Sequence, residues 1–251
     1  DHQLAWTREA GFDGVGFHAS AGVPGRWRGI DPGTCSAAQR QRLRRELERF
    51  SFVEVHAPFE VELSGETPAS GTDALAPILA FAGDLGAQVV TVHARIPVSG
   101  EARCSAAWPA AMRELNTAAA RAQTRIALEI TGGFDEVMRW GLPDVGVNLD
   151  VGHMYLPANR HVLGQRGGIG ELIRHLGGTL MHLHLHDVRG DTDHVEIGTG
   201  EVDFHETAAA LRDIHYRGGA TVELNPDRVT PRGIRRSARY LRGCFGGDTS
   251  E

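Results

Sequence analysis

Seven short apolar segments alternate with helical patterns along the chain, and this alternation constrains the fold more than any other feature of the sequence. Strands and helices that alternate in this way form parallel βαβ units, because two parallel strands need a crossover connection between them. The pattern therefore predicts an α/β fold. The expected strands are Gly14–Phe17 running into His18, Phe52–His56, Val89–His93, Ile126–Ile130, Val145–Asp150, Leu180–His186 and Thr221–Leu224.

Helical periodicity fills the stretches between these strands. The expected helices are Leu4–Ala10, Ala37–Phe50, Asp73–Leu85, Trp108–Gln123, Asp135–Trp140, Ile169–Leu176, Phe204–Ile214 and Gly233–Leu241. The longest irregular stretches each follow a strand, and they are Ala19–Cys35, Leu63–Thr72, Ile96–Ala107 and Asp187–Val202. In a parallel barrel the loops after the strands all open onto one face, and chemistry collects there.

The length of 251 residues suits a single α/β barrel as well as two smaller domains. We expect one domain over residues 1–251, because no domain-scale linker and no low-complexity tract divides the chain. The chain opens inside a helical pattern, so we expect an eighth strand, the first of a barrel, to precede Asp1 and to be missing from this sequence.

The composition excludes several classes of function. Every basic side chain is an arginine, which rules out a lysine Schiff base and with it pyridoxal phosphate chemistry. A net charge of −6 argues against a general binder of nucleic acid. Gly198 and Gly200 do not form a dinucleotide fingerprint, so no NAD site is expected.

Cysteine usage and hydropathy bear on where the chain resides. Cys35, Cys104 and Cys244 lie far apart and form neither a disulfide framework nor a CxxC pair, which favours a reducing compartment. No apolar run approaches the ~18 residues of a membrane span. We therefore expect a cytoplasmic protein.

Histidines and carboxylates stand near the carboxyl ends of the expected strands. Residues alternate between the two faces of a strand, and this alternation places these side chains inside a barrel. Several buried carboxylates would cost several kcal/mol each unless they were compensated, and no lysine is present to do so. A divalent cation would compensate them directly. The residues are His18, His56, His93, Glu129, Asp150, His184 and Glu223.

Three motifs follow one another at strand ends: Asp150-Val-Gly-His153, His184-Leu-His-Asp187, and a segment from His194 that includes Gly198 and Gly200. With Glu129 before and Glu223 after them, they resemble the xylose isomerase-like TIM-barrel superfamily over essentially the whole chain. That superfamily contains sugar (phosphate) isomerases and epimerases, inosose dehydratases and the endonuclease IV type of AP endonuclease. The resemblance implies a xylose isomerase-like TIM (β/α)8 barrel.

The same resemblance implies a divalent metal site on Glu129, Asp150, His184 and Glu223. Three carboxylates and one imidazole suit Mn²⁺, Mg²⁺, Co²⁺ or Zn²⁺. In the epimerases that the chain resembles, the two glutamates also act as the catalytic acid/base pair. His153 would orient a substrate hydroxyl.

Further histidines could either bind a second metal ion or contact the substrate. The expected second-metal or substrate residues are His56, His93, His153 and His194, and the expected substrate-binding residues are His153, His186, Arg189 and His18. By resemblance to endonuclease IV, the ninth zinc ligand would fall on Thr192, which puts a full trinuclear cluster in doubt. True xylose isomerases use a catalytic lysine, which this chain lacks.

The best interpretation of the sequence is a metal-dependent isomerase or epimerase of a small sugar, sugar phosphate or related polyhydroxy carbonyl compound. Three alternatives stay open: an endonuclease IV-like AP endonuclease, an inosose-type dehydratase and a non-catalytic ligand-binding barrel. The expected partner is a small carbohydrate rather than nucleic acid or membrane. A homodimer is common among the proteins that the chain resembles.

Overall fold

The structure is a computed structural model that describes residues 2–24, 27–65, 68–97 and 106–246. The chain divides into two compact units, which are described in turn. The N-terminal unit is Asp13–Asn148, and the C-terminal unit is Asp1–Phe12 together with Leu149–Glu251. The single domain expected over residues 1–251 stays a prediction.

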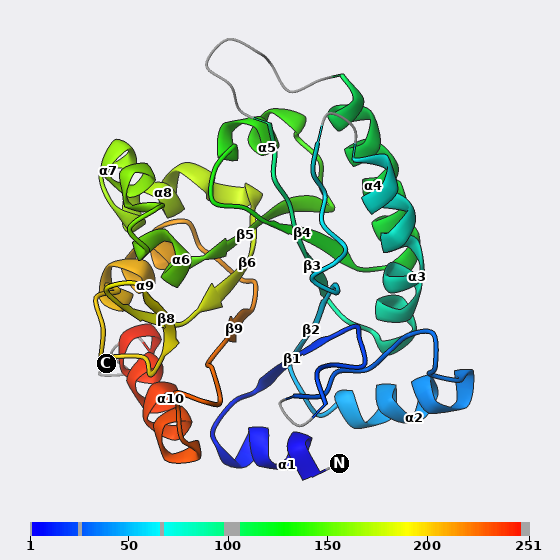
Figure 1. The fold of residues 1–251 in the computed structure, drawn as a ribbon, viewed down its shortest axis with the longest axis horizontal. Helices are drawn as coiled ribbons and strands as arrows, with labels where there is room; N and C mark the ends of the chain where they lie inside the picture. Colours follow the sequence, from blue (N-terminus) through cyan, green and yellow to red (C-terminus); the bar gives the residue numbers. More distant parts are fainter. Residues whose placement is uncertain (1, 25–26, 66–67, 98–105, 247–251) are drawn as a thin grey trace. The chain divides into compact units, whose positions relative to one another are not determined.

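Five parallel strands form the sheet of the N-terminal unit, in the order in which they follow along the chain (Figure 1). The register places His18 beside His56, and His93 beside Glu129, so that polar residues line up at the carboxyl ends of the strands. The strands are β1 (Gly14–His18), β2 (Phe52–His56), β3 (Val89–His93), β4 (Arg125–Glu129) and β5 (Val145–Asp150). The last two residues of β5 belong to the C-terminal unit.

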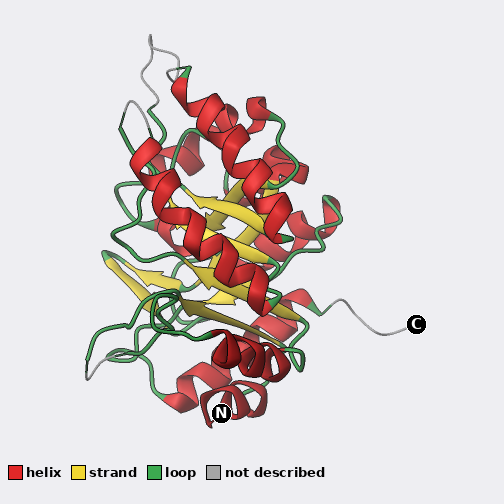
Figure 2. Ribbon diagram, turned by 90° about the vertical axis from the view of Figure 1, so that its right-hand side faces the viewer, coloured by secondary structure: helices red, strands yellow, loops and turns green. Residues whose placement is uncertain are grey.

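Four helices connect these strands along the chain. Figure 2 shows the helices of the protein in red and its strands in yellow. Ser36 starts the first of the four connecting helices with a capping box, in which its side chain and that of Gln39 each bond to the other residue's backbone. Leu75, Leu79 and Trp108 are buried on the inner faces of the helices. The helices are α2 (Ala37–Leu47), α3 (Ala69–Leu85), α4 (Ala107–Ala122) and α5 (Phe134–Trp140).

The C-terminal unit contains two parallel strands, β6 (Leu180–Leu185) and β9 (Ala220–Val222), and a separate antiparallel pair, β7 (Asp187–Arg189) and β8 (Thr192–Val195). Its helices are α1 (His2–Glu9), α6 (Val151–Tyr155), α7 (Arg160–Arg166), α8 (Ile169–Leu176), α9 (Phe204–Asp213) and α10 (Pro231–Phe245), with a 3₁₀ turn at Gly177–Thr179.

The expected alternation of faces is found in both units. In the N-terminal unit, the hydroxyl of Thr91 donates to Glu54 at 2.6 Å across β2 and β3. In the C-terminal unit, His182 Nε2 lies 3.0 Å from the hydroxyl of Thr221 across β6 and β9. His182 is thus an interior histidine whose Nε2 has a polar partner. Val55, which follows Glu54 on the opposite face of β2, is also fully buried.

Two of the stretches expected to be irregular contain regular structure. Asp187–Val202 includes the β7–β8 pair, and α3 begins at Ala69, inside Leu63–Thr72. The greater part of Ile96–Ala107 lies outside the described residues. Within the part of the chain that the structure describes, no helix is both long and apolar enough to cross a membrane. The cytoplasmic location and the homodimer stay predictions.

Candidate active site

The first polar cluster gathers at the carboxyl ends of β2, β3 and β4 in the N-terminal unit. The Nε2 atoms of His56 and His93 lie 3.4 and 3.6 Å from Oε2 of Glu129. Asn148 donates to the same oxygen at 3.3 Å. One ligand atom from each of His56, His93 and Glu129 lies within 4.8 Å of the others, which is close enough for all three to share one cation.

The tautomer of His56 favours such a role. Its Nδ1 lies 2.7 Å from the backbone carbonyl of Ala57, so that a proton on Nδ1 is hydrogen-bonded there. The Nε2 lone pair then faces the Glu129 carboxylate. Nε2 of His56 and Oε2 of Glu129 would repel each other in this buried place, and a proton or a cation between them removes the repulsion.

Aromatic side chains stand beside this cluster. The ring of His18 lies 4.8 Å from Trp27, 4.8 Å from Phe59 and 4.5 Å from His56, measured between centroids. Phe59 is 53% exposed although it also contacts His93. An exposed aromatic face next to polar groups provides an apolar wall for a ligand that the polar groups orient.

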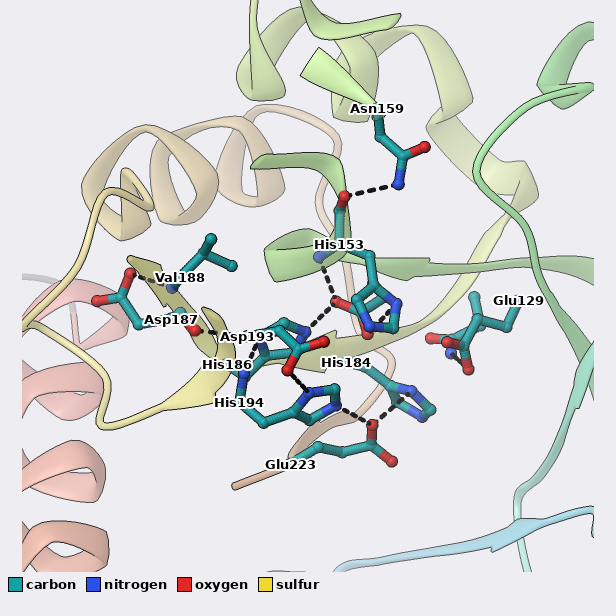
Figure 3. Close-up of polar contacts among 12 residues, drawn as sticks. Glu129, His153, Asn159, His184, His186, Asp187, Val188, Asp193, His194 and Glu223 are labelled. Carbon is teal, nitrogen blue, oxygen red and sulfur yellow. Dashed lines mark hydrogen bonds and ion pairs between the residues drawn. The ribbon is translucent and has the colours of Figure 1, made fainter. Parts of the chain in front are cut away.

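The second cluster surrounds Asp150 in the C-terminal unit and includes His153, His186 and His194, which are labelled in Figure 3. Asp150 caps α6, because its Oδ1 accepts the backbone N–H of His153 at 2.9 Å. Its Oδ2 lies 2.9 Å from Nδ1 of His153, and its Oδ1 lies 3.0 Å from Nε2 of His186. Ligand atoms of Asp150, His153, His186 and His194 all lie within 4.8 Å of one another.

These neighbours keep Asp150 ionised. Burial alone would raise the pKa of its carboxyl group, but the adjacent His186 and His153 lower that pKa well below its usual value. A buried carboxylate among imidazoles is therefore present as an anion at neutral pH.

Glu223 follows β9 and approaches two histidines in the same unit. Its Oε2 lies 3.4 Å from Nδ1 of His184 and 3.7 Å from Nε2 of His194. Nδ1 of His194 lies 3.2 Å from Asp193. Burial lowers the pKa of His194, but the contacts with Glu223, Asp150 and Asp193 outweigh it, and the pKa lies above its usual value.

Residues 4–244 match the sequence pattern of the family described as the xylose isomerase-like TIM barrel. The chain belongs to this family. The predicted resemblance is confirmed, and with it the TIM-barrel fold. The crystal structure of a xylose isomerase domain protein from Planctomyces limnophilus superposes with a TM-score of 0.73 at 20% identity, over 97% of this chain and 91% of that one.

Two further relatives of this xylose isomerase-like chain carry named activities. D-psicose 3-epimerase from Clostridium cellulolyticum H10, solved with D-tagatose, has a TM-score of 0.73 at 17% identity, over 97% of this chain and 93% of that one. L-ribulose 3-epimerase from a Methylomonas species is 30% identical over 139 residues, which are 51% of this chain and 44% of that protein. The chain spans less than half the length of the curated relatives that it matches.

Each unit of this xylose isomerase-like chain offers donors that fit a divalent cation. In the C-terminal unit, Oδ2 of Asp150 is buried and makes no hydrogen bond of good geometry with any residue that the structure describes. A buried polar atom in that state is what a bound ion satisfies. The expected ligands Asp150, His184 and Glu223 lie in this unit and Glu129 in the other, so the shared site of four stays a prediction.

The other predicted residues are placed as follows. His186 is fully buried, and His153 and His194 are partly exposed beside it. Arg189 is exposed, and its guanidinium donates to the carbonyl of Thr199 at 2.9 Å. The substrate-binding roles expected for His18, His153, His186 and Arg189 are not tested by these positions.

Asp187 has a role that sequence reasoning did not find. Its buried carboxylate accepts hydrogen bonds from five backbone N–H groups at 2.8–3.1 Å, and these groups belong to Val188, Gly198, Thr199, Gly200 and Val202. The loop after β8 is thereby tied to the start of β7, next to His186. The only signal in the sequence was its place in the His184-Leu-His-Asp187 motif.

Proposed function

We propose that this protein is a divalent-metal-dependent isomerase or epimerase of a small sugar, a sugar phosphate or a related polyhydroxy carbonyl compound. One observation carries the proposal: Glu129 and Glu223 each stand at the carboxyl end of a strand against two imidazoles. Membership of the xylose isomerase-like family and the likeness to two sugar 3-epimerases support it.

The residues proposed to hold the ion are Glu129, Asp150, His184 and Glu223. Carboxylate oxygens and imidazole nitrogens suit Mn²⁺, Mg²⁺, Co²⁺ and Zn²⁺ alike, so the donor set supports a divalent ion without selecting one. When bound, such an ion polarises a carbonyl group and acidifies the neighbouring C–H bond.

The two glutamates supply the proton transfer in this proposal. One carboxylate removes the proton from the carbon next to the carbonyl, and the other glutamate, as a carboxylic acid, returns a proton to the same carbon or to its neighbour. Return to the same carbon from the other side inverts it. Return to the former carbonyl carbon, together with transfer of the neighbouring hydroxyl proton to the former carbonyl oxygen, moves the carbonyl. The imidazole of His153, which is partly exposed, would orient a substrate hydroxyl. Phe59, Trp27 and His18 would pack against the apolar side of the sugar.

Solvent-deuterium exchange tests the proposal. The purified protein, loaded with Mn²⁺, is incubated in D₂O with ketoses such as D-psicose and L-ribulose, and deuterium incorporation and product are followed by NMR. Glu129→Gln and Glu223→Gln are each expected to lower exchange by about 10²- to 10⁴-fold, the usual contribution of a general acid or base. Glu46→Gln, on α2 and paired with Arg42, is the matched control and keeps full exchange. Exchange that is unchanged in both site variants would contradict the mechanism.

The endonuclease IV-like alternative is favoured by the number of imidazoles, because each unit has its own cluster that could hold a cation. Metal analysis distinguishes the two: one ion per chain supports the isomerase, and three support a nuclease. Cleavage of an abasic-site duplex by the zinc-loaded protein would establish the alternative.

A dehydratase would share the first proton removal but release water and an unsaturated or deoxy product.

A further inference from the structure

The cluster around Asp150 has four members, and three of them are histidines. A histidine nitrogen binds a cation only through its lone pair, so the location of the ring proton decides its role. Of the three histidines, His186 is the one that is fully buried, and its surroundings determine its tautomer.

Nδ1 of His186 accepts a hydrogen bond from the backbone N–H of His194, at 3.0 Å. His194 has a positive φ of 50°, which turns this N–H out of the regular strand pairing. Nδ1 also lies 3.2 Å from the carbonyl oxygen of Asp187, which would accept from the opposite tautomer. That tautomer, however, would set the ring N–H against the backbone N–H of His194 and leave a backbone donor without its acceptor. The Nε2–H tautomer avoids this cost.

In this tautomer the Nε2–H of His186 faces Asp150, and Nε2 lies 3.0 Å from Oδ1 of that carboxylate. Oδ1 already accepts the backbone N–H of His153. Two donors on Oδ1 orient the carboxylate and leave Oδ2, which lies 2.9 Å from Nδ1 of His153, as the oxygen available to a cation.

The ring of His186 is held in place from several sides. A Cβ atom on Gly152 would come within 2.2 Å of Cε1, so only glycine leaves room for the imidazole there. The ring also stacks on His194, with centroids 4.0 Å apart and planes inclined by 12°, and meets His153 edge-on at 4.9 Å. A side chain packed in this way cannot turn its other nitrogen toward Asp150.

We infer that His186 is a positioning residue, which holds the Asp150 carboxylate through Nε2–H and does not itself bind the metal. The inference goes beyond the proposed function, because it concerns the proton on one ring and the orientation of one carboxylate. It stands whether or not the chain turns over a sugar.

NMR of the wild-type chain measures this tautomer directly. The protein is labelled with ¹⁵N at its histidine rings, and two-bond ¹H–¹⁵N spectra are recorded without metal and with zinc chloride. His186 is assigned through the backbone of its neighbours. The expected result is an unprotonated Nδ1 and a protonated Nε2 in both states. A protonated Nδ1, or an Nε2 that carries zinc, would overturn the inference.

Zinc affinity, measured by calorimetry on two variants, gives an independent test. His186→Gln keeps an amide N–H for Asp150 and an oxygen of similar reach, and it is expected to bind zinc nearly as the wild type does. His186→Leu removes the donor at similar volume, and it is expected to bind about 10- to 100-fold more weakly, the usual effect of losing an outer-shell partner. Equal loss in both variants would make His186 a ligand, and no loss in either would deny it a positioning role.

His182→Gln is the matched control for replacing a buried histidine with glutamine. His182 is buried in β6, and its Nε2 contacts Thr221 rather than Asp150. It is expected to leave the zinc affinity unchanged.

Discussion

Gly152 and His186 occupy adjoining space, and a methyl group on Gly152 would lie 2.2 Å from Cε1 of the imidazole. The glycine of the Asp-Val-Gly-His motif is thereby linked to a histidine between β6 and β7, 34 positions further along the chain (186 − 152). Since His186 has no room to retreat, the two positions are expected to respond together to substitution.

Gly152→Ala is therefore expected to destabilise the protein by about 1–3 kcal/mol, the usual cost of overpacking a filled interior. Chemical denaturation measures this change. Gly164→Ala is the control, because Gly164 lies in α7 with nothing within 4 Å of an added methyl group. That substitution is expected to stabilise the protein by about 0.5–1 kcal/mol through helix propensity. The prediction is wrong if both alanines have the same effect.

Asp187→Asn is expected to destabilise the protein by about 3 kcal/mol, because an amide offers one oxygen where the carboxylate offers two and its NH₂ group would face backbone donors. Hydrogen exchange of the amides of Gly198–Val202 is expected to accelerate, since these amides lose their acceptor. Asp191→Asn, at the exposed turn between β7 and β8, is the control and should change stability by no more than about 0.5 kcal/mol. Unchanged exchange in the Asp187 variant would contradict the role assigned to this carboxylate.

Divalent metal is expected to raise the melting temperature of the chelator-treated protein. An ion that binds only the folded state contributes about 2.7 kcal/mol at a free concentration 100 times its Kd. For a chain of this length that corresponds to a rise of about 5–10 °C. Calorimetry with and without Mn²⁺ or Zn²⁺ measures the shift. Asp150→Asn should reduce it, whereas Asp213→Asn, which loses only a surface pair with Arg174, should not.

The pair of Glu196 and Arg236 predicts a pH dependence away from the site. Arg236 donates to both carboxylate oxygens at 2.6 Å and lowers the pKa of Glu196 from its ordinary value of 4.5. A lowered folded-state pKa contributes stability that is present above the unfolded value and is lost as the pH falls through the folded one. Glu196→Gln should therefore melt slightly below the wild type near neutral pH, and the difference should shrink as the pH falls below 4.5 and vanish below the lowered pKa of Glu196. A difference that grows on acidification would contradict this assignment.

The strands were predictable because apolar residues form short runs that end in turn or helix signals. β2 and β3 have the expected bounds, and β4 differs by one residue at each end. The β7–β8 pair was missed because its residues, such as Arg189 and Thr192, are largely polar and show no apolar alternation. α6 was missed because it is five residues long and begins directly at the end of β5, under the cap of Asp150.

The sequence motifs indicated which residues could form the site, but not which atoms of these residues contact one another. Strand ends and family resemblance indicated Glu129, Asp150 and His184 as the residues to examine. The sequence carries no sign of which histidine nitrogen bears a proton, because that depends on a backbone N–H of His194 brought in by the fold. The five bonds of Asp187 were hidden for the same reason, since they end on main-chain groups.

The way in which Asp187 holds its loop has a consequence for how this protein can diverge. All five of its bonds end on backbone N–H groups, so substitution of the side chains of Thr199 and Glu201 leaves these five bonds in place. Both positions are exposed, and their side chains bond instead to the Glu196 carbonyl, the backbone N–H of Gly190 and Arg160. A change there would remove these outer bonds but keep the anchor at Asp187, which leaves evolution a partly independent frame on which to try new surface chemistry.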